Sequence, residues 1–146
     1  DRQAFWYGSD YSGKRRFRSR RSIVAKTTFV KYLQAGESIS YGATYTAQSD
    51  EWVATLPIGY ADGYLRRMQG FKVLVAGQKC DILGRICMDQ MMIRLPESMP
   101  IGTEVVLMGS SKGKTLSATD LADHAHTINY EILTSITPRL MRRYKN

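Results

Sequence analysis

Short runs of β-branched and aromatic residues recur along this 146-residue chain, and they restrict its possible fold more than any other feature. Breaks rich in Gly, Pro or polar residues separate the runs. They follow one another at intervals of about 8–12 residues, a spacing typical of β architecture. The expected strands cover residues 26–33, 52–56, 71–75, 80–83, 90–95 and 103–108. We therefore predict a mainly β domain of short strands, built as a closed β-barrel or as a sandwich-like structure.

Local turn and cap signals complete this expectation. Ala76-Gly77-Gln78 lies between two expected strands and indicates a hairpin. One short helix is expected over residues 63–69. A second begins at Ser117, whose hydroxyl can cap it together with Asp120 three residues later. The predicted domain therefore contains two short helices.

Length and composition favour a single globular domain. The 146 residues, of which 43% are hydrophobic, suffice for one core. No apolar run approaches the roughly 18 residues that a bilayer span requires. The N-terminus shows no signal-peptide pattern. Cys80 and Cys87 do not form a CxxC pair, so we expect reduced thiols in a cytoplasmic protein without membrane attachment.

Positive charge is concentrated at the N-terminus. Residues 1–21 hold seven Lys and Arg against two Asp and so carry +5 of the total net charge of +8. With Tyr11 and Phe17 interleaved, this arm could bind phosphates and stack on bases. A solvated basic arm explains the same pattern, and we do not expect nucleic-acid binding. We treat residues 1–21 as a basic segment of unassigned role and residues 22–146 as the domain.

Two motifs imitate ligand sites. The segment from Gly109 to Thr115 resembles a phosphate-binding loop, but it has three residues between its glycines where the motif needs four. We therefore expect a hairpin or connector there. His124 and His126 could bind zinc, but side chains two residues apart on a helix point in different directions. We expect no metal site.

The segment from Arg85 to Ile93 is the most unusual stretch, because it places Arg85 and Asp89 in an otherwise apolar run. A buried charge needs a partner, so a structural ion pair or a solvated strand end would explain it in isolation. Three further stretches accompany it: Ser40-Tyr41-Gly42-Ala43-Thr44-Tyr45, Pro57-Ile58-Gly59-Tyr60-Ala61-Asp62-Gly63-Tyr64 and Thr127-Ile128-Asn129-Tyr130-Glu131. In order and spacing, the four stretches resemble the C-terminal β-domain of bacterial alanine racemase, a pyridoxal-phosphate (PLP) enzyme. The resemblance extends from about Ser22 to the C-terminus.

The resemblance implies a catalytic role for Tyr41. In this family, a lysine on an N-terminal barrel carries PLP, which makes the α-carbon of the substrate acidic. A tyrosine from the β-domain of the partner subunit acts on the opposite face, and Tyr41 matches it. Gly42 lets the backbone turn tightly beside this phenol. Because tyrosine has a pKa near 10, a role as base requires nearby positive charge.

Other matched residues would surround the substrate. Met88 matches the residue whose backbone N–H binds the substrate carboxylate. Tyr60 and Tyr130 match tyrosines that narrow the entrance, and Tyr130 also matches the one that contacts the cofactor phosphate. The remaining matches line or support the channel: Arg66, Arg85, Ile128 and Asp89. A mutual structural pair of Arg85 and Asp89, or a solvated helix face for Arg66, remains an alternative.

One expected part of the enzyme is missing from the sequence. None of the eight lysines lies in a motif like that of the cofactor lysine, and no barrel of roughly 250 residues precedes the domain. The resemblance thus implies a racemase fragment or half of a split enzyme, inactive alone and homodimeric in full-length form. Its function would be L- to D-alanine conversion for peptidoglycan, although serine as substrate stays open.

Two other interpretations compete with this one. The domain could be a non-catalytic interaction module whose basic arm binds acidic partners. Alternatively, the surface that would pack on the barrel could be exposed and apolar, which favours self-association.

Overall fold

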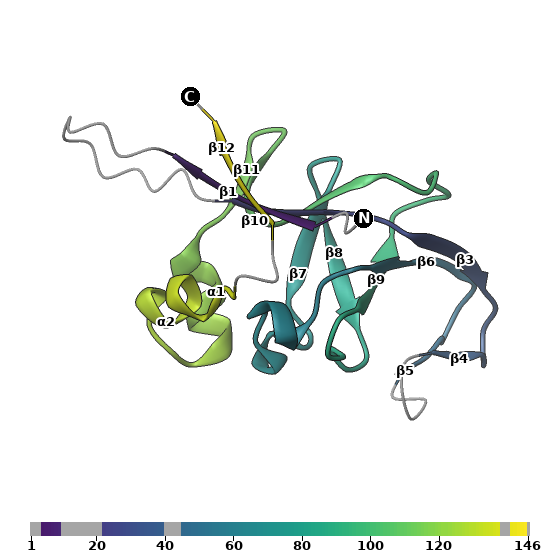
Figure 1. Cartoon of the computed structure of the whole chain (residues 1–146). Coiled ribbons are helices and arrows are strands. Elements are labelled where there is room, and N and C mark those ends of the chain that lie inside the picture. The colour runs from purple at the N-terminus through teal and green to yellow at the C-terminus, as the bar shows by residue number, and fades with distance from the viewer. Residues whose placement is uncertain (1–3, 10–21, 40–44, 138–140, 146) are drawn as a thin grey trace.

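The structure is a computed structural model that describes residues 4–9, 22–39, 45–137 and 141–145. Its main feature is a ten-stranded sheet (Figure 1). Nine strands follow one another in space in this order: β12 (Met141–Lys145), β1 (Ala4–Ser9), β2 (Ser22–Lys26), β10 (Glu104–Ser111), β7 (Lys72–Val75), β8 (Gln78–Leu83), β9 (Met91–Leu95), β6 (Glu51–Leu56) and β3 (Phe29–Leu33). The tenth strand, β11 (Lys114–Leu116), pairs with β10. All neighbours are antiparallel except β1 and β12, which are parallel.

The predicted fold class is confirmed: over the residues that the structure describes, the domain is mainly β and sandwich-like, with two α-helices. The closed-barrel version is wrong for the part of the chain described, because the sheet ends at β12 and at β3. The strand expected over 26–33 is divided in two at Thr27 and Thr28. The Thr27 N–H donates to Thr103 at 3.0 Å, whereas the Thr28 N–H donates to Thr55 at 3.0 Å. The chain therefore changes its pairing partner at these two residues: β2 pairs with β10, whereas β3 pairs with β6.

The predicted turns are hairpins. Ala76 and Gly77 join β7 to β8. Their φ values are 51° and 78°, and a two-residue hairpin turn of type I′ requires positive φ at both positions. Lys112 and Gly113 have φ values of 45° and 83° and join β10 to β11. The segment that imitates a phosphate loop is therefore a hairpin, as expected.

The helices agree only in part with expectation. Helix α1 (Ala118–Ala125) is capped as predicted: the Asp120 N–H donates to Ser117 Oγ at 3.0 Å, and the Ser117 N–H donates to Asp120 Oδ2 at 2.8 Å. The prediction of a helix over residues 63–69 is wrong. Two 3-10 turns, η1 (Tyr60–Asp62) and η2 (Arg66–Met68), occupy this region, because Gly63 is left-handed at φ 97° and Leu65 is extended. Helix α2 (Asn129–Ser135) was not predicted; Ile128 precedes it without a side-chain cap.

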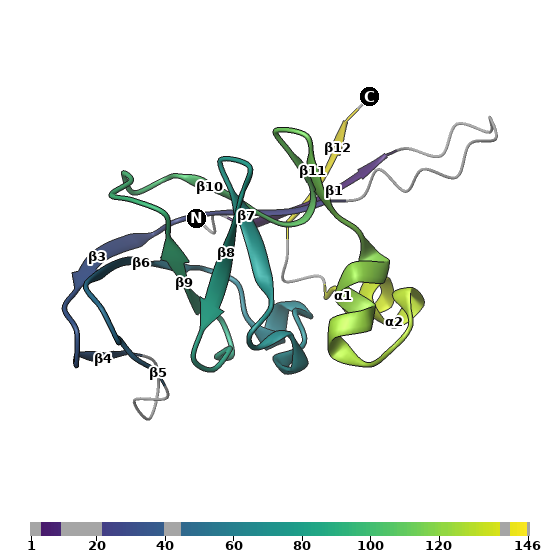
Figure 2. The same ribbon diagram turned by 180° about the vertical axis from the view of Figure 1, so that it is seen from behind.

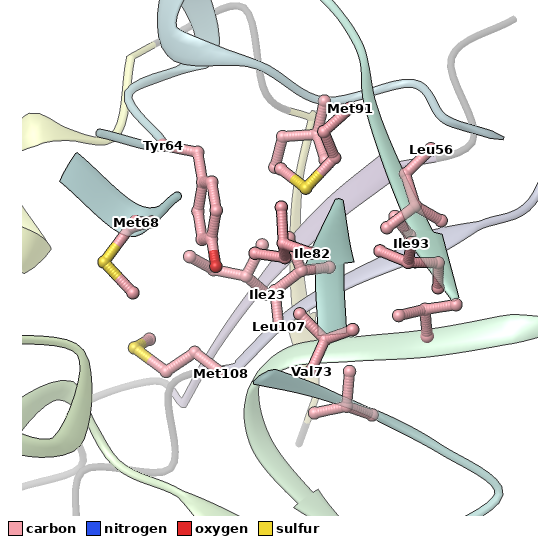
Figure 3. Packing of buried hydrophobic residues seen from close by; sticks show 14 of the residues in the cluster. Ile23, Leu56, Tyr64, Met68, Val73, Ile82, Met91, Ile93, Leu107 and Met108 are labelled. Carbon is pink, nitrogen blue, oxygen red and sulfur yellow. The ribbon is translucent and has the colours of Figure 1, made fainter. Parts of the chain in front are cut away.

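One large apolar cluster lies between the sheet and these helices (Figure 3). Ile23, Leu107 and Ile93 are fully buried in it. The ring of Tyr64 reaches into the same cluster, and its hydroxyl has no hydrogen-bond partner in the described structure. Burial raises the pKa of this phenol above its usual value. Tyr64 thus fixes the segment after η1 to the core.

Seen from both sides, several irregular segments lie along one edge of the sheet (Figures 1 and 2). The turns η1 and η2, the loop before β9 and the pair α1–α2 lie along this edge. The β7–β8 and β10–β11 hairpins lie at the opposite edge. Within the described ranges, no helix has the length and apolar character needed to cross a membrane. The motifs of residues 57–64 and 127–131 and the first part of the segment from Arg85 to Ile93, which lies in the loop of residues 84–90, are therefore found along the first of these edges.

Candidate active-site surface

The turn η1 is bound to the loop of residues 84–90 through the backbone. The Tyr60 N–H donates to the Cys87 carbonyl at 3.1 Å, and the Ala61 N–H donates to the Met88 carbonyl at 2.8 Å. A Cβ at Gly59 would lie 2.1 Å from the same Cys87 oxygen. Only glycine therefore allows the two backbones to approach this closely.

A buried carboxylate holds η1 in shape. Asp62 Oδ2 accepts a hydrogen bond from the Gly59 N–H at 3.0 Å, and the Asp62 side chain is completely buried. Because a buried carboxylate must be hydrogen-bonded, this bond favours one conformation of the turn. Asp62 thus fixes the two amides of η1 that bind the 84–90 loop.

Helix α2 is attached to the same segment at its C-terminal end. The Ser135 hydroxyl donates to the Gly63 carbonyl at 3.0 Å. Thr137 makes two more bonds: its N–H donates to the Asp62 carbonyl at 3.0 Å, and its hydroxyl donates to the Ala61 carbonyl at 2.8 Å. A Cβ at Gly63 would lie 1.9 Å from the Ser135 backbone carbonyl oxygen. Residues 59–63 are therefore the common support for the loop and for α2.

An arginine connects η2 to both helices. Arg67 Nη1 donates to the Ala125 carbonyl at 3.2 Å, and Nη2 forms an ion pair with Glu131. The Thr127 hydroxyl donates to the second oxygen of Glu131 at 2.8 Å. The Thr127 hydrogen bond, with help from the Arg67 charge, lowers the pKa of Glu131. These contacts orient the start of α2, where Ile128 and Tyr130 lie.

The expected site residues share one property, which is exposure at this edge. Tyr60 is 44% exposed, Met88 51%, Ile128 65% and Tyr130 72%. Single exposed hydrophobic side chains are common on proteins, but a group of them at one edge is typical of a contact surface. The guanidinium of Arg66 lies 5.6 Å from the centre of the Tyr60 ring, within cation–π range. Four aromatic or apolar side chains and a cation are therefore presented together.

For the remaining predicted residues, the structure gives the exposure or the neighbouring strands. Arg85 and Asp89 are exposed on the 84–90 loop, and their mutual pairing stays a prediction. Tyr41 lies outside the described residues. The strands before and after it, β4 (Ser38–Ile39) and β5 (Tyr45–Thr46), pair with each other antiparallel.

A second tyrosine of the Tyr41 motif has a structural environment. The Tyr45 hydroxyl donates to Glu51 and accepts from Arg94 Nη2 at 2.8 Å. Burial, followed by the hydrogen bond to Glu51, raises the pKa of Tyr45. A phenol with a raised pKa stays protonated at neutral pH and cannot serve as a base.

Sequence reasoning missed the residues that support the surface rather than form it. Asp62, Arg67 and Glu131 were not singled out, nor was Arg94. One signal was present: Gly59 and Asp62 have the spacing of a capping box, in which the third residue binds back to the cap. No local pattern could link Arg67 to Glu131, which is 64 residues away.

The geometry defines a β-domain that exposes aromatic, apolar and cationic side chains at one edge. Residues 21–144 match the family model "Alanine racemase, C-terminal domain", and the chain belongs to this family.

Relatives and solved structures agree with this assignment. The alanine racemase of Limosilactobacillus fermentum is 68% identical over 123 residues, which are 84% of this chain and 33% of that protein. The alanine racemase of Lactiplantibacillus plantarum is 56% identical, again over 84% of this chain and 33% of the relative. The chain thus spans about a third of the length of these relatives.

Two solved structures define how far the fold extends. The alanine racemase from Bacillus anthracis with bound L-Ala-P has a TM-score of 0.84 and 47% identity, covering 86% of this chain and 33% of its own. A histidine racemase from Leuconostoc mesenteroides has a TM-score of 0.82 and 35% identity, covering 86% of this chain and 34% of its own. Racemases named for different amino acids therefore share this domain, and its fold alone does not select the substrate.

Proposed function

We propose that this chain is the C-terminal domain of a PLP-dependent alanine racemase and supplies Tyr41 to the active site of a partner subunit. The enzyme would interconvert L- and D-alanine in the cytoplasm and provide D-alanine for peptidoglycan. The family match over residues 21–144 carries the proposal. The edge that exposes Tyr60, Met88 and Tyr130 supports it, because large apolar and aromatic side chains gathered on one exposed edge are typical of a contact surface.

The described residues fit a role beside PLP, although they do not include its lysine. Bound PLP would withdraw electrons from the α-carbon of the substrate and make it acidic. Tyr130 would hold the cofactor phosphate. Its side chain is 72% exposed, and its hydroxyl has no hydrogen-bond partner within the described part of the chain. A phenolic O–H is a suitable donor to a phosphate oxygen.

Different residues of this chain would attract the substrate, bind its carboxylate and transfer its proton. Arg66 and Arg85, both exposed cations, would attract the alanine carboxylate. The Met88 N–H would bind that carboxylate and orient the α-carbon. The Tyr41 phenol would give a proton to one face of the α-carbon and its phenolate would remove one, provided that positive charge nearby lowers its pKa.

The second acid–base group would come from the barrel domain. In the proposed homodimer, the exposed edge of this domain packs against the barrel of the partner subunit, which carries the cofactor lysine. Packing there would cover Tyr60, Met88, Ile128 and Tyr130 and so remove apolar surface from water. On this proposal the chain alone has negligible racemase activity.

Complementation tests the proposal. The 146-residue chain is mixed with a racemase whose own tyrosine at the position of Tyr41 has been changed to alanine, and D- to L-alanine conversion is assayed. We expect activity to return with the unchanged chain and to be absent with its Tyr41→Phe variant, which folds alike but lacks the phenol. No return of activity from a chain shown to be folded would refute the proposal and favour a non-catalytic interaction module. Robust racemisation by the chain alone would also contradict it.

A further inference from the structure

The two carbonyl groups that η1 binds determine where two backbone N–H groups point. The Cys87 carbonyl shares a peptide unit with the Met88 N–H, and the Met88 carbonyl shares one with the Asp89 N–H. The described chain contains no cis peptide bond. In a planar trans unit the N–H points opposite to the carbonyl. Because both carbonyls point toward η1, at 3.1 and 2.8 Å from its amides, both N–H groups point away from η1.

These two amides are free to bind a ligand. Neither N–H has a hydrogen-bond partner in the described structure, and Met88 is 51% exposed. The neighbouring Cys87 N–H differs, because it donates to the Gln90 carbonyl at 2.9 Å and closes the loop. Met88 and Asp89 therefore lie at the tip of a short loop whose base is held.

Successive backbone N–H groups that point the same way form a concavity for an anion. Binding of the carbonyl on one side of a peptide unit also polarises its N–H and strengthens it as a donor. Positive charge is near, since Arg66 lies against the ring of Tyr60, whose N–H makes one of the two bonds. The ligand favoured here is a small carboxylate, whose two oxygens match two donors.

We propose that the Asp89 backbone N–H is a second donor to the substrate carboxylate beside that of Met88, and that the Gly59–Asp62 turn aims both. The identity of the carboxylate as alanine rests on the proposed function. Two donors would fix the carboxylate in rotation as well as in position, whereas one leaves it free to turn. Gly59 and Asp62 act as positioning residues: Gly59 allows the close approach, and Asp62 binds its N–H at 3.0 Å.

A titration on the chain alone tests whether the pair binds a carboxylate. The ¹⁵N-labelled chain is titrated with sodium acetate against sodium chloride at equal ionic strength. We expect the Met88 and Asp89 amide protons to move downfield along one saturation curve, while the Cys87 amide stays in place. A shift at Met88 without one at Asp89 would overturn the second donor. No shift at either amide would overturn the preformed site.

Backbone esters test the contribution to catalysis. The chain is assembled by ligation at Cys80 from a synthetic segment of residues 80–146, in which an ester replaces the amide of Asp89. In the complementation assay, loss of one charge-assisted bond should raise KM for alanine about tenfold and change kcat less. The matched control is an ester at Ile101, an exposed residue in the connection between β9 and β10, which should leave KM unchanged. An unchanged KM for the Asp89 ester would overturn the proposal.

Variants of Asp62 test the positioning role. Asp62→Asn keeps an acceptor oxygen for the Gly59 N–H and should retain both acetate shifts. Asp62→Leu should lose both shifts; if it does not fold, the asparagine variant and the ester still decide. Absence of complementation by the unchanged chain would refute the proposed function, while the acetate titration would independently decide whether two amides bind a carboxylate.

Discussion

Two arginine networks in this domain differ in what they connect. Arg94 on β9 bonds to Glu51 on β6 at 2.7 Å, to Asp81 on β8 at 2.6 Å and to Tyr45 on β5 at 2.8 Å. Arg67 on η2 bonds to the last residue of α1 and to Glu131 on α2. The Glu51 side chain is 9% exposed, whereas that of Glu131 is 44% exposed. One network joins three strands of the large sheet to β5 of the small β4–β5 sheet, and the other joins segments that carry predicted site residues.

The comparison shows that the more buried network, around Arg94, is not the one that supports the predicted site residues. Burial alone would lower the pKa of the Arg94 guanidinium, but hydrogen bonds with Tyr45 and Glu51 outweigh it and raise the pKa. Removal of this cation would leave the buried Glu51 carboxylate without its partner and so destabilise the fold. An exposed ion pair such as that of Arg67 adds little to global stability. We expect Arg67 to act instead on the local order of α2.

The largest effect is expected for Arg94→Met. The substitution keeps most of the side-chain volume but leaves the buried carboxylate of Glu51 without its cation. The free energy of unfolding should fall by about 2 kcal/mol. Urea denaturation measures this, with Arg94→Lys as the control; a lysine keeps the charge but cannot bridge three partners, so its loss should be intermediate. A loss as small as that of Arg67→Met would remove the distinction between the networks.

A smaller effect is expected for Glu51→Gln. Glutamine keeps an acceptor for Arg94 but removes the negative charge, so stability should fall by about 1 kcal/mol. The pKa of Tyr45 should fall as well, because the hydrogen bond to Glu51 helps to raise it. Since the folded pKa of Tyr45 is raised, its contribution to stability is present below the unfolded pKa and is lost as pH rises through the folded value. NMR of ¹³C-labelled tyrosine follows this titration, and an unchanged Tyr45 pKa would contradict the proposed coupling.

The networks also explain what the sequence could and could not predict. Short apolar runs such as 52–56 and 103–108 require only local information, and these strands were found within a few residues of their bounds. The cap at Ser117 is local too. Arg94 lies 43 residues from Glu51 and 49 from Tyr45, so no local pattern identifies the network. Helix α2 was missed because contacts with residues 61–67, rather than a cap, hold it in place.

The site was predictable to the extent that its motifs are contiguous. Tyr60, Met88 and Tyr130 came from a family resemblance, and the structure places them at one exposed edge. Their supports are different. The bond from Gly59 to the Asp62 carboxylate is local, but the close approach at Gly59 depends on the path of a loop more than 20 residues further along the chain. A single sequence does not show that Gly59 and this loop lie close together in space.

A third prediction concerns Arg67→Met, which should cost much less global stability than Arg94→Met and should lose most of its effect in high salt. Its main consequence is local. Amides of α2 should exchange faster with solvent, because the bond to Glu131 at the start of the helix is gone. Hydrogen exchange resolved by residue measures this, and Arg67→Lys should retain part of the protection. Uniform loss of protection in the sheet and in α2 would show that the two networks have the same role.

The smallest effect is expected for Thr127→Val, which removes the hydroxyl that donates to Glu131. That hydrogen bond is the main cause of the lowered Glu131 pKa, so the pKa should rise toward its usual value. A carboxylate with a lowered folded pKa stabilises the fold above its unfolded pKa, and this contribution is lost as pH falls through the folded pKa. In the variant this contribution should be smaller, and its loss on acidification should be complete at a higher pH, because only the folded pKa has risen. Carbon NMR of the Glu131 carboxyl and urea midpoints measured between neutral and acidic pH test this. The Arg67–Glu131 pair should persist in the variant, because its partners are untouched. If the valine variant instead titrates like the unchanged chain, the orientation of Glu131 depends on Arg67 alone, and the network that holds α2 is a single ion pair.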